Sequence, residues 1–325
     1  MFAMGPAFFS GASGALSLSG TFPAAVIGVP YDQYLTIAGG STPYSLTGGT
    51  GLASGTLPAG LTLSIASTTH LRLSGTPTGT AGTSSFTASV GSADGQTATS
   101  TQSIVVSAAD PYFSNVIFLL HCNGPNLSTT LTDVTGRIWT MRGSSGHLDT
   151  GWKAFGTTSY YIGTGWSPSS NQGATTPATA DFNFGTGDFT IEWTQYWDNA
   201  VDFQTIFDNG GTAAGALLIQ TGNGDSKYHV YVSGVSICAE TTAPAFKAAS
   251  QYMLRKISGV YELYRNGVLT ASASNTTAIT GSAGSVAWGA YASGANGSPN
   301  YIDELRGTKG VARANTIQTA PFPDS

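Results

Sequence analysis

The chain has 325 residues, which is more than one ordinary β-sandwich needs and suits two domains of about 100–200 residues each. Glycine accounts for 43 residues and charged residues for only 9%, a composition that favours short strands joined by tight turns and excludes a fold built on amphipathic helices. The net charge of −5 with scattered basic residues excludes nucleic acid as a partner, and no apolar run reaches the ~18 residues of a membrane helix, which excludes membrane insertion.

Residues 1–21 are predicted to be an N-terminal arm. Their Gly, Ala, Ser and Leu content cannot build a core, so we expect the arm to be held by another subunit. The stretch Met1–Phe9 is apolar, but no Lys or Arg precedes it, and glycine and proline interrupt it. This is unlike a secretory signal peptide, and we expect a protein made in a cytoplasm without export.

Residues 22–108 are predicted to be an immunoglobulin-like module. Alternating polar and apolar residues predict strands at 34–37, 61–65, 71–73, 85–90 and 103–106, separated by glycine-rich turns. The segments Gly55–Leu63 and Leu73–Gly82 resemble those of immunoglobulin-like modules of bacterial surface and phage proteins. The resemblance covers most of residues 24–107 and implies a small β-sandwich.

Residues 109–325 are predicted to form a second, larger sandwich after a linker at Ala108–Pro111, where Asp before Pro favours an extended chain. Asn266-Gly267 between apolar alternations predicts a hairpin. About ten strands are too many for an immunoglobulin module and suit a jelly roll. They are predicted at 116–122, 154–162, 188–197, 204–207, 216–220, 228–233, 252–258, 261–265, 286–291 and 301–306.

Three segments of this region, Phe184–Trp193, Tyr261–Leu269 and Tyr301–Arg306, resemble the laminin-G-like, concanavalin-A-like lectin and glucanase family over roughly residues 112–325. The ending, Gly310–Arg313 followed by Ala320–Pro323, is similar to the version of this domain common in tailed-phage virion proteins. Relatives carry Trp-His-His before the Asn-Gly hairpin, where this chain has Gln-Tyr-Met at 251–253. The resemblance implies an all-β fold and carbohydrate recognition.

Glycoside hydrolases share the jelly-roll architecture, and their retaining chemistry needs two carboxylates about 5 Å apart. On a regular strand such a pair would be two or four residues apart. Glu192 has no carboxylate two residues away, and Asp303 and Glu304 are consecutive, so a regular strand would place them on opposite faces. We therefore expect no enzymatic activity.

The densest acidic cluster consists of Asp198, Asp202 and Asp208. Oxygen-rich loops suit Ca²⁺, and laminin-G-like domains often hold Ca²⁺ at a loop rim. The alternative is that these are solvated turn residues, because their spacing matches no dedicated calcium loop. The four histidines are far apart in the sequence, which argues against a zinc site.

The remaining candidates for a binding site are aromatic and amide residues, since exposed aromatic faces pack on sugar rings and amides bond to hydroxyl groups. Trp193 and Trp288 lie in strand patterns and are predicted to be core residues. We predict ligand contacts at Trp166, in a loop rich in turn residues, and at Tyr161 and Asn209. The alternative for Trp166 is that it covers the edge of the sandwich.

Three functions remain open at this point. The first is a phage virion protein at a tail tip, a tail fibre or a capsid surface, which is bound to other virion proteins through its arm and displays a lectin-like domain for glycan or host-surface attachment. The second is a bacterial surface or secreted adhesin, and the third, disfavoured, is an endoglycosidase. The first implies a homo-oligomer or multiple copies on a symmetric particle. Cys122 and Cys238 could form one disulfide, but a reducing cytoplasm favours two free thiols.

Overall fold

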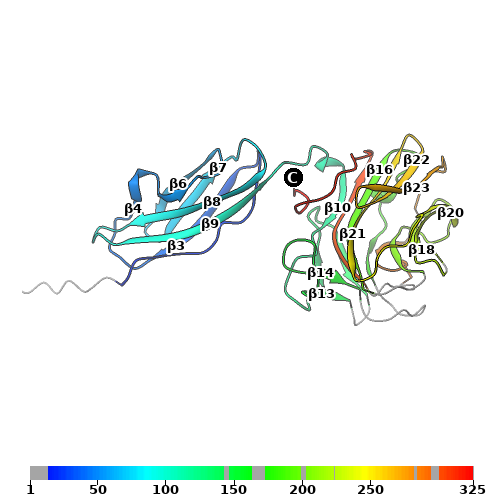
Figure 1. The fold of residues 1–325 in the computed structure, drawn as a ribbon, viewed down its shortest axis with the longest axis horizontal. Helices are drawn as coiled ribbons and strands as arrows, with labels where there is room; N and C mark the ends of the chain where they lie inside the picture. The colour runs from blue at the N-terminus through cyan, green and yellow to red at the C-terminus, as the bar shows by residue number, and fades with distance from the viewer. Residues whose placement is uncertain are drawn as a thin grey trace, which may run out of the picture. The chain divides into compact units, whose positions relative to one another are not determined.

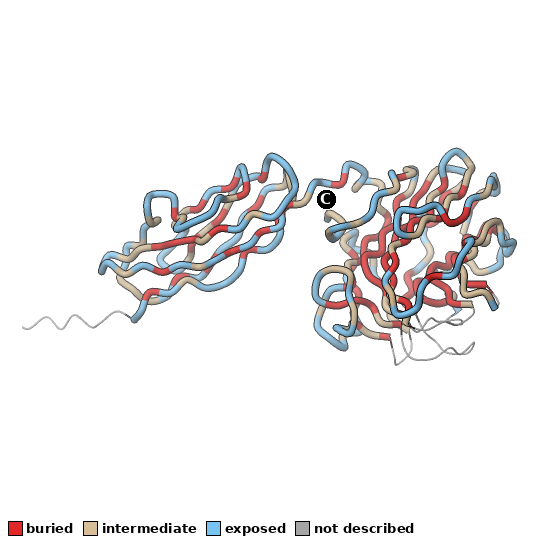
Figure 2. Tube along the Cα trace, in the orientation of Figure 1, coloured by how far each residue is buried: buried red, intermediate tan, exposed pale blue. Residues whose placement is uncertain are grey.

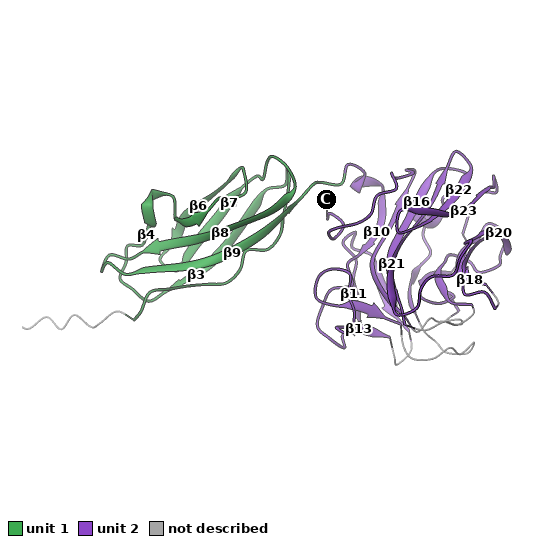
Figure 3. Cartoon of the chain, viewed as in Figure 1, with its two compact units in different colours: residues 1–110, 325 green, residues 111–324 purple. Residues whose placement is uncertain are grey.

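The computed structural model describes residues 14–142, 146–162, 173–198, 203–222, 224–281, 284–293 and 300–324. It divides into two compact units, residues 1–110 and 111–324 (Figures 1 and 3). Strands make up nearly all of the regular structure, with three short 3₁₀ turns at Thr47–Gly49, Phe113–Asn115 and Ala180–Phe182. The fold is all-β, as predicted, and no helix in the described part of the chain is long and apolar enough to cross a membrane.

The first unit is a sandwich of two sheets. One sheet has the order β1 (Ser17–Ser19), β3 (Tyr31–Ala38), β7 (His70–Gly75), β6 (Leu61–Ser67). The other has the order β2 (Ala25–Val26), β9 (Thr97–Ser107), β8 (Gly82–Gly91), β4 (Ser45–Leu46), with β5 (Leu52–Gly55) also paired to β8. Buried residues alternate with exposed ones along the longer strands and form one core (Figure 2).

The first unit begins earlier in the chain than the sequence predicts. β1 lies inside the segment assigned to the arm and pairs with the end of β3. Leu16 and Phe22 belong to the buried core. Two glutamines of β9 and its preceding turn hold this segment, because the amides of Leu16 and Phe22 donate to Gln96 Oε1 (2.8 Å) and Gln102 Oε1 (2.9 Å). Residues 1–13 lie outside the described part.

The second unit consists of two eight-stranded sheets that enclose a large core. We call the sheet that carries the candidate site the first large sheet. Its strand order is β13 (His147–Asp149), β14 (Ser159–Tyr161), β25 (Tyr301–Lys309), β16 (Phe189–Trp197), β21 (Ala248–Ile257), β22 (Val260–Arg265), β23 (Val268–Ser274). The eighth strand, β10 (Val116–Leu120), pairs with β25. The second large sheet has the order β11 (Thr130–Thr132), β12 (Ile138–Met141), β15 (Ala174–Pro177), β24 (Ser285–Trp288), β17 (Thr205–Asp208), β18 (Leu217–Thr221), β19 (Tyr228–Val232), β20 (Val235–Ala239).

Aromatic side chains fill the space between the two large sheets. Trp193 and Trp288 are each 1% exposed, which confirms their prediction as core residues. Phe118 of β10 lies among four other rings, those of Trp139, Phe182, Phe207 and Trp288, at centroid distances of 5.3–6.5 Å. Edge-on and offset contacts of this kind add stability beyond the area they bury.

The predicted hairpin is confirmed, because β22 and β23 are antiparallel and joined by Asn266 (φ 50°) and Gly267 (φ 77°). Two positive φ angles are the requirement of a type I′ turn. The strand predicted at 154–162 is shorter than expected and spans only Ser159–Tyr161. The chain turns at Gly156 (φ 66°), where a side chain would meet Asn123. Both cysteines are free thiols.

Candidate functional site

A cleft of about 430 Å³ opens on the outer face of the first large sheet. Alternation along β16 places Trp193 and Trp197 in the core and turns Thr194 to the opposite face, toward the cleft. The lining includes Trp152, Phe155, Thr194, Gln251, Asn266 and Ile317. One wall is thus the segment 152–155, and the other is formed by the turn at 266 and the C-terminal part of the chain.

A row of half-buried rings continues from this cleft across four strands. His147, Tyr161, Tyr301 and Tyr196 are cross-strand neighbours on β13, β14, β25 and β16. The ring centroids of Tyr161 and Tyr301 are 4.7 Å apart, and those of Tyr196 and Tyr301 are 6.1 Å apart. Trp152 stacks on Tyr196 at 5.6 Å with an interplanar angle of 27°. We call Trp152, Tyr196, Tyr301 and Tyr161 the aromatic row.

Charged groups border the aromatic row. Burial raises the pKa of Tyr161, and the carboxylates of Asp198 and Asp149 raise it further. The pKa of Tyr301 is raised by burial and then by Asp149. Asp198 is paired with Lys247. The aromatic row therefore offers apolar ring faces, and the carboxylates of Asp149 and Asp198 and the ammonium group of Lys247 lie around it.

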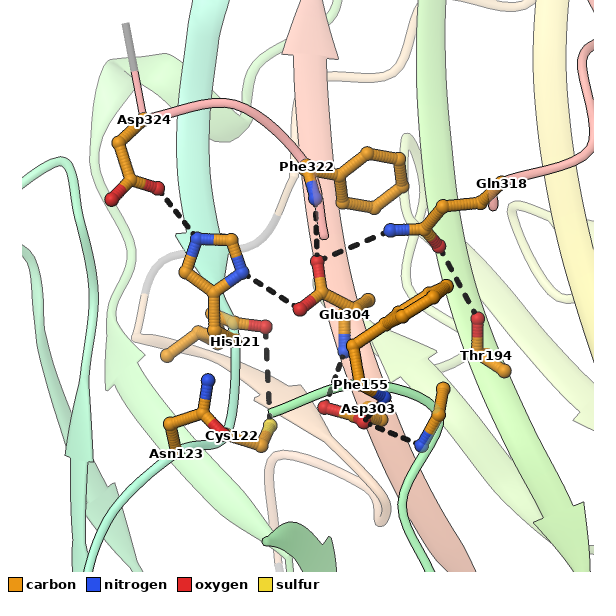
Figure 4. A network of polar contacts seen from close by, with 12 residues as sticks. His121, Cys122, Asn123, Phe155, Thr194, Asp303, Glu304, Gln318, Phe322 and Asp324 are labelled. Carbon is orange, nitrogen blue, oxygen red and sulfur yellow. Dashed lines mark hydrogen bonds and ion pairs between the residues drawn. The ribbon is translucent and has the colours of Figure 1, made fainter. Parts of the chain in front are cut away.

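Two consecutive carboxylates lie beneath this surface in one polar network (Figure 4). Asp303 and Glu304 are both fully buried on β25. The prediction that they face opposite sides of a regular strand is wrong, because Glu304 has a φ of 51° and the register with β16 shifts by one residue there. This β-bulge breaks the alternation of side chains.

The two carboxylates hold different segments. Asp303 Oδ2 accepts the amides of Ala154 (2.8 Å) and Phe155 (3.1 Å), which belong to the wall of the cleft, and Asp303 Oδ1 accepts the amide of Glu304 (3.0 Å). Glu304 Oε2 accepts Gln318 Nε2 (3.2 Å) and the amide of Phe322 (2.9 Å). Burial, followed by the neighbouring charge of Glu304, raises the pKa of Asp303 to about 7.

The C-terminal strap, residues 311–324, crosses the outer face of the first large sheet in an extended form. Side chains of the sheet satisfy its backbone. Thr190 Oγ1 donates to the carbonyl of Val311 and accepts the amide of Arg313, both at 2.9 Å. Gln251 bonds to both backbone groups of Gln318, at 2.7 and 2.8 Å. Such side-chain contacts fix a segment that has no strand partner of its own.

His121 fastens the end of the strap. Its Nδ1 lies 2.8 Å from Glu304 Oε1, and its Nε2 lies 2.6 Å from Asp324 Oδ1 (Figure 4). Burial opposes the charged imidazole, but the hydrogen bonds to Asp324 and Glu304 outweigh it and raise the pKa of His121 to about 10. The imidazolium thus links two carboxylates that would otherwise repel each other.

Of the predicted ligand-binding residues, the structure places Tyr161 in the aromatic row. Trp166 lies outside the described residues. Asn209 is fully buried, and its amide bonds to backbone groups of Leu217 (2.6 Å) and Phe182 (3.3 Å), which gives it a structural role, and a ligand contact there stays a prediction.

The predicted calcium ligands are not brought together in the described part of the chain, where no group of three or more His, Cys, Asp or Glu side chains could hold a metal. Asp208 is 1% exposed. Its carboxylate accepts the amides of Gly210, Gly211 and Ala292 beside a second hollow of about 400 Å³. Asp198 pairs with Lys247 instead. Asp202 lies outside the described residues, and a calcium site that includes it stays a prediction.

Sequence reasoning missed Trp152, Tyr196 and Tyr301 as a group. Trp152 and Tyr196 belong to the aromatic content of the second unit, yet nothing in the sequence pairs them, since they are 44 residues apart in numbering. A usable signal existed on β16. The core positions Trp193 and Trp197 imply that Tyr196 points outward.

Comparison with known proteins bears mainly on the first unit. Residues 15–107 match the family described as putative Ig domain. The comparison with curated proteins found no match.

Solved structures with similarity include domain 4 of an extracellular arabinanase from Geobacillus stearothermophilus, solved with arabinotriose (17% identity, TM-score 0.44, 60% of this chain and 93% of that one). They also include the sialidase of Trypanosoma rangeli with sialic acid (13% identity, TM-score 0.44, 60% of this chain and 31% of that one). A third is the binding domain of botulinum neurotoxin serotype C1 (12% identity, TM-score 0.44, 62% of this chain and 50% of that one). This chain spans about a third of the sialidase and half of the neurotoxin domain.

Proposed function

We propose that the chain is an adhesion protein whose second unit binds glycans through the aromatic row and the adjoining cleft. The observation that carries this proposal is the stack of Trp152 on Tyr196 beside a cleft on the outer face of the first large sheet. Half-buried rings offer flat apolar faces, and the hydroxyl of Thr194 and the amide of Asn266 add polar groups to the lining of the adjoining cleft. This combination suits a sugar, whose rings have C–H faces and hydroxyl edges.

We propose binding without catalysis. The carboxylates that line or underlie the outer face already have partners. Asp303 and Glu304 hold backbone segments, and Glu192 pairs with Arg306 at 2.7 Å. A retaining hydrolase needs two carboxylates free to meet the substrate. Release of reducing sugar from a polysaccharide panel would contradict this part of the proposal.

A glycan array probed with the full chain tests binding. We expect a defined set of glycans to bind, and Trp152→Ala to weaken binding about fivefold or more, since one aromatic contact contributes about 1 kcal/mol. Tyr34→Ala is the matched control, because Tyr34 is an exposed ring of the first unit (47%). Equal loss in both variants, or no glycan bound by the wild type, would contradict the proposal.

The finer hypothesis is a virion location, with the protein bound to other virion proteins through its N-terminal arm and carried in multiple copies. It is supported by the pairing of an immunoglobulin-like unit with a lectin-like one and by the similarity of the C-terminal segment to phage proteins. A bacterial surface or secreted adhesin is the alternative. Mass spectrometry of purified virions and fractionation of the host cell would separate the two.

A further inference from the structure

A buried carboxylate holds one wall of the cleft, together with Ser159, whose Oγ donates to the carbonyl of Trp152. The segment 152–155 has two consecutive amides, those of Ala154 and Phe155, that donate to the same oxygen of Asp303. Trp152, the member of the aromatic row that also lines the cleft, lies in this wall. Beyond the wall the chain turns at Gly156, and Asn123 Oδ1 accepts the amide of Thr157 at 2.8 Å.

We propose that Asp303 is the positioning residue of the glycan site and that its protonation regulates binding by loosening the 152–155 wall. The proposal rests on the glycan-binding function above. Asp303 is fully buried, so it does not touch a ligand in the cleft. It acts through the wall that it holds.

The geometry explains why a proton matters here. Three backbone N–H groups converge on the two oxygens of Asp303, two on Oδ2 and one on Oδ1. A carboxylate is a pure acceptor and can take all three, whereas a protonated carboxyl carries an O–H that is itself a donor. A proton on Oδ2 displaces one of the two wall amides, and a proton on Oδ1 leaves both of them on an uncharged oxygen. In either case the hydrogen bonds that hold the wall become weaker, because bonds to a charged acceptor are about twice as strong as neutral ones.

The opposite wall responds differently. Gln318 and Phe322 of the strap are held by Glu304, which His121 also contacts. The strap is further tied by Gln251, which bonds to both backbone groups of Gln318. The strap therefore has anchors that do not involve Asp303, and the main expected effect of loosening at Asp303 is on the position of Trp152.

Two titratable groups interact with Asp303 directly, Glu304 on the same strand and the Cys122 thiol just after β10. His121 contacts Glu304 and, on its other side, Asp324 of the strap, and Lys153 belongs to the wall segment. The hydrogen bonds of His121 keep its pKa at about 10, and burial raises the pKa of the Cys122 thiol. Neither group titrates near neutrality. The pKa of Asp303, raised to about 7, lies in this range. Acidification from pH 8 to pH 6 is thus expected to weaken glycan binding.

Hydrogen exchange on the full chain tests the wall without any ligand. We expect the protection factors of the Ala154 and Phe155 amides to fall about tenfold from pH 8 to pH 6, because their hydrogen bonds change from charge-assisted to neutral or are lost. The reference amides are those of Leu119 and Thr135, which donate to the buried Asp133 at 3.1 and 2.8 Å. Constant protection of Ala154 and Phe155 relative to these references would overturn the proposal.

Calorimetric titration with a glycan identified on the array tests the site itself. In the wild type we expect the dissociation constant to rise about five- to tenfold from pH 8 to pH 6. Asp303→Asn should bind about tenfold more weakly at pH 8 and show a flat profile. Asp133→Asn is the matched control and should keep the wild-type profile, and so should His147→Gln, which removes the imidazole next to Tyr161.

The outcomes separate this proposal from the proposed function. If the wild type binds no glycan while exchange at Ala154 and Phe155 depends on pH and on Asp303, the glycan-binding function fails and the role of Asp303 in holding the wall stands. If glycan binds and Asp303→Asn leaves both affinity and pH profile unchanged, the positioning role fails and glycan binding stands. A pH profile that disappears in His147→Gln and persists in Asp303→Asn also overturns it. The wild-type measurements need no variant to fold.

Discussion

Replacing His121 with glutamine should lower the stability of the second unit in a way that depends on pH. The pKa of His121 is raised from its ordinary value of 6.5 to about 10, because Asp324 and Glu304 favour the charged imidazole more than burial opposes it. A group with a raised pKa in the folded protein stabilises it fully below its unfolded pKa. That contribution is lost as the pH rises through the folded value. The benefit of His121 is thus complete at pH 6 and disappears toward pH 10.

The size of the effect follows from the two pKa values. The difference corresponds to about 5 kcal/mol at ~1.4 kcal/mol per pKa unit. Asp324 is 61% exposed, and solvent screens its share of the attraction, so about 2 kcal/mol is the expected loss at pH 6. Asp324→Asn removes only the exposed carboxylate partner of His121, and the loss of unfolding free energy should be about half as large.

Denaturant unfolding followed by tryptophan fluorescence provides the assay. All six tryptophans follow residue 110, so the signal reports on the second unit alone. The difference in unfolding free energy between wild type and His121→Gln should shrink from pH 6 to pH 9.5. Asp181→Asn is the control, because the hydrogen bond from Arg137 lowers the pKa of Asp181 and its effect should stay constant over this range. A constant difference for His121→Gln would refute the reasoning.

Three further predictions concern packing, backbone strain and a buried hydrogen bond. Gly307→Ala should lower the unfolding free energy of the second unit by about 2–3 kcal/mol in the same fluorescence assay, because the new Cβ would lie 2.2 Å from the ring of the buried Phe118; an unchanged midpoint would contradict this. Gly267→Ala should lower the unfolding free energy by about 1–2 kcal/mol, because φ is 77° in the type I′ turn and Ile317 is close. Gly224 has the same φ but open space around it, so Gly224→Ala measures the backbone strain without the contact. Gln102→Ala leaves the amide of Phe22 unpaired, and calorimetry should show a loss of about 1–3 kcal/mol in the first unit only.

Local sequence patterns were enough to predict the fold class, the core tryptophans and the Asn-Gly hairpin, because strand alternation and turn preferences depend on only a few consecutive residues. Strands as short as β11 and β13, with three residues each, leave too little alternation to predict. For Asp208 the alternative of a turn residue fits the structure, although the side chain is buried and not solvated. It precedes Asn-Gly-Gly, and an Asp side chain bonds readily to amides two or three residues later, as it does here to Gly210 and Gly211.

The aromatic row could not be predicted in the same way, because it depends on which strands are neighbours. Alternation indicates that Tyr196 and Tyr301 are partly exposed, but the order β13, β14, β25, β16 brings together segments from both ends of the second unit. Strand order is set by packing of the whole sandwich. Local sequence therefore indicates which face a ring occupies and leaves its partners open.

The bulge at Glu304 can be recognised in the spacing of apolar residues along β25. In β25 the core residues Ile302 and Leu305 are three positions apart, whereas side chains on one face of a regular strand recur every two. A regular register would direct Glu304 into the core opposite Trp193, at the cost of burying an unpaired charge among aromatic rings. The extra residue avoids this. It returns Leu305 to the core and lets Arg306 pair with Glu192, and it leaves two adjacent carboxylates free to hold two separate backbone segments. The arrangement that positions the cleft is therefore a consequence of keeping a charged residue out of the core.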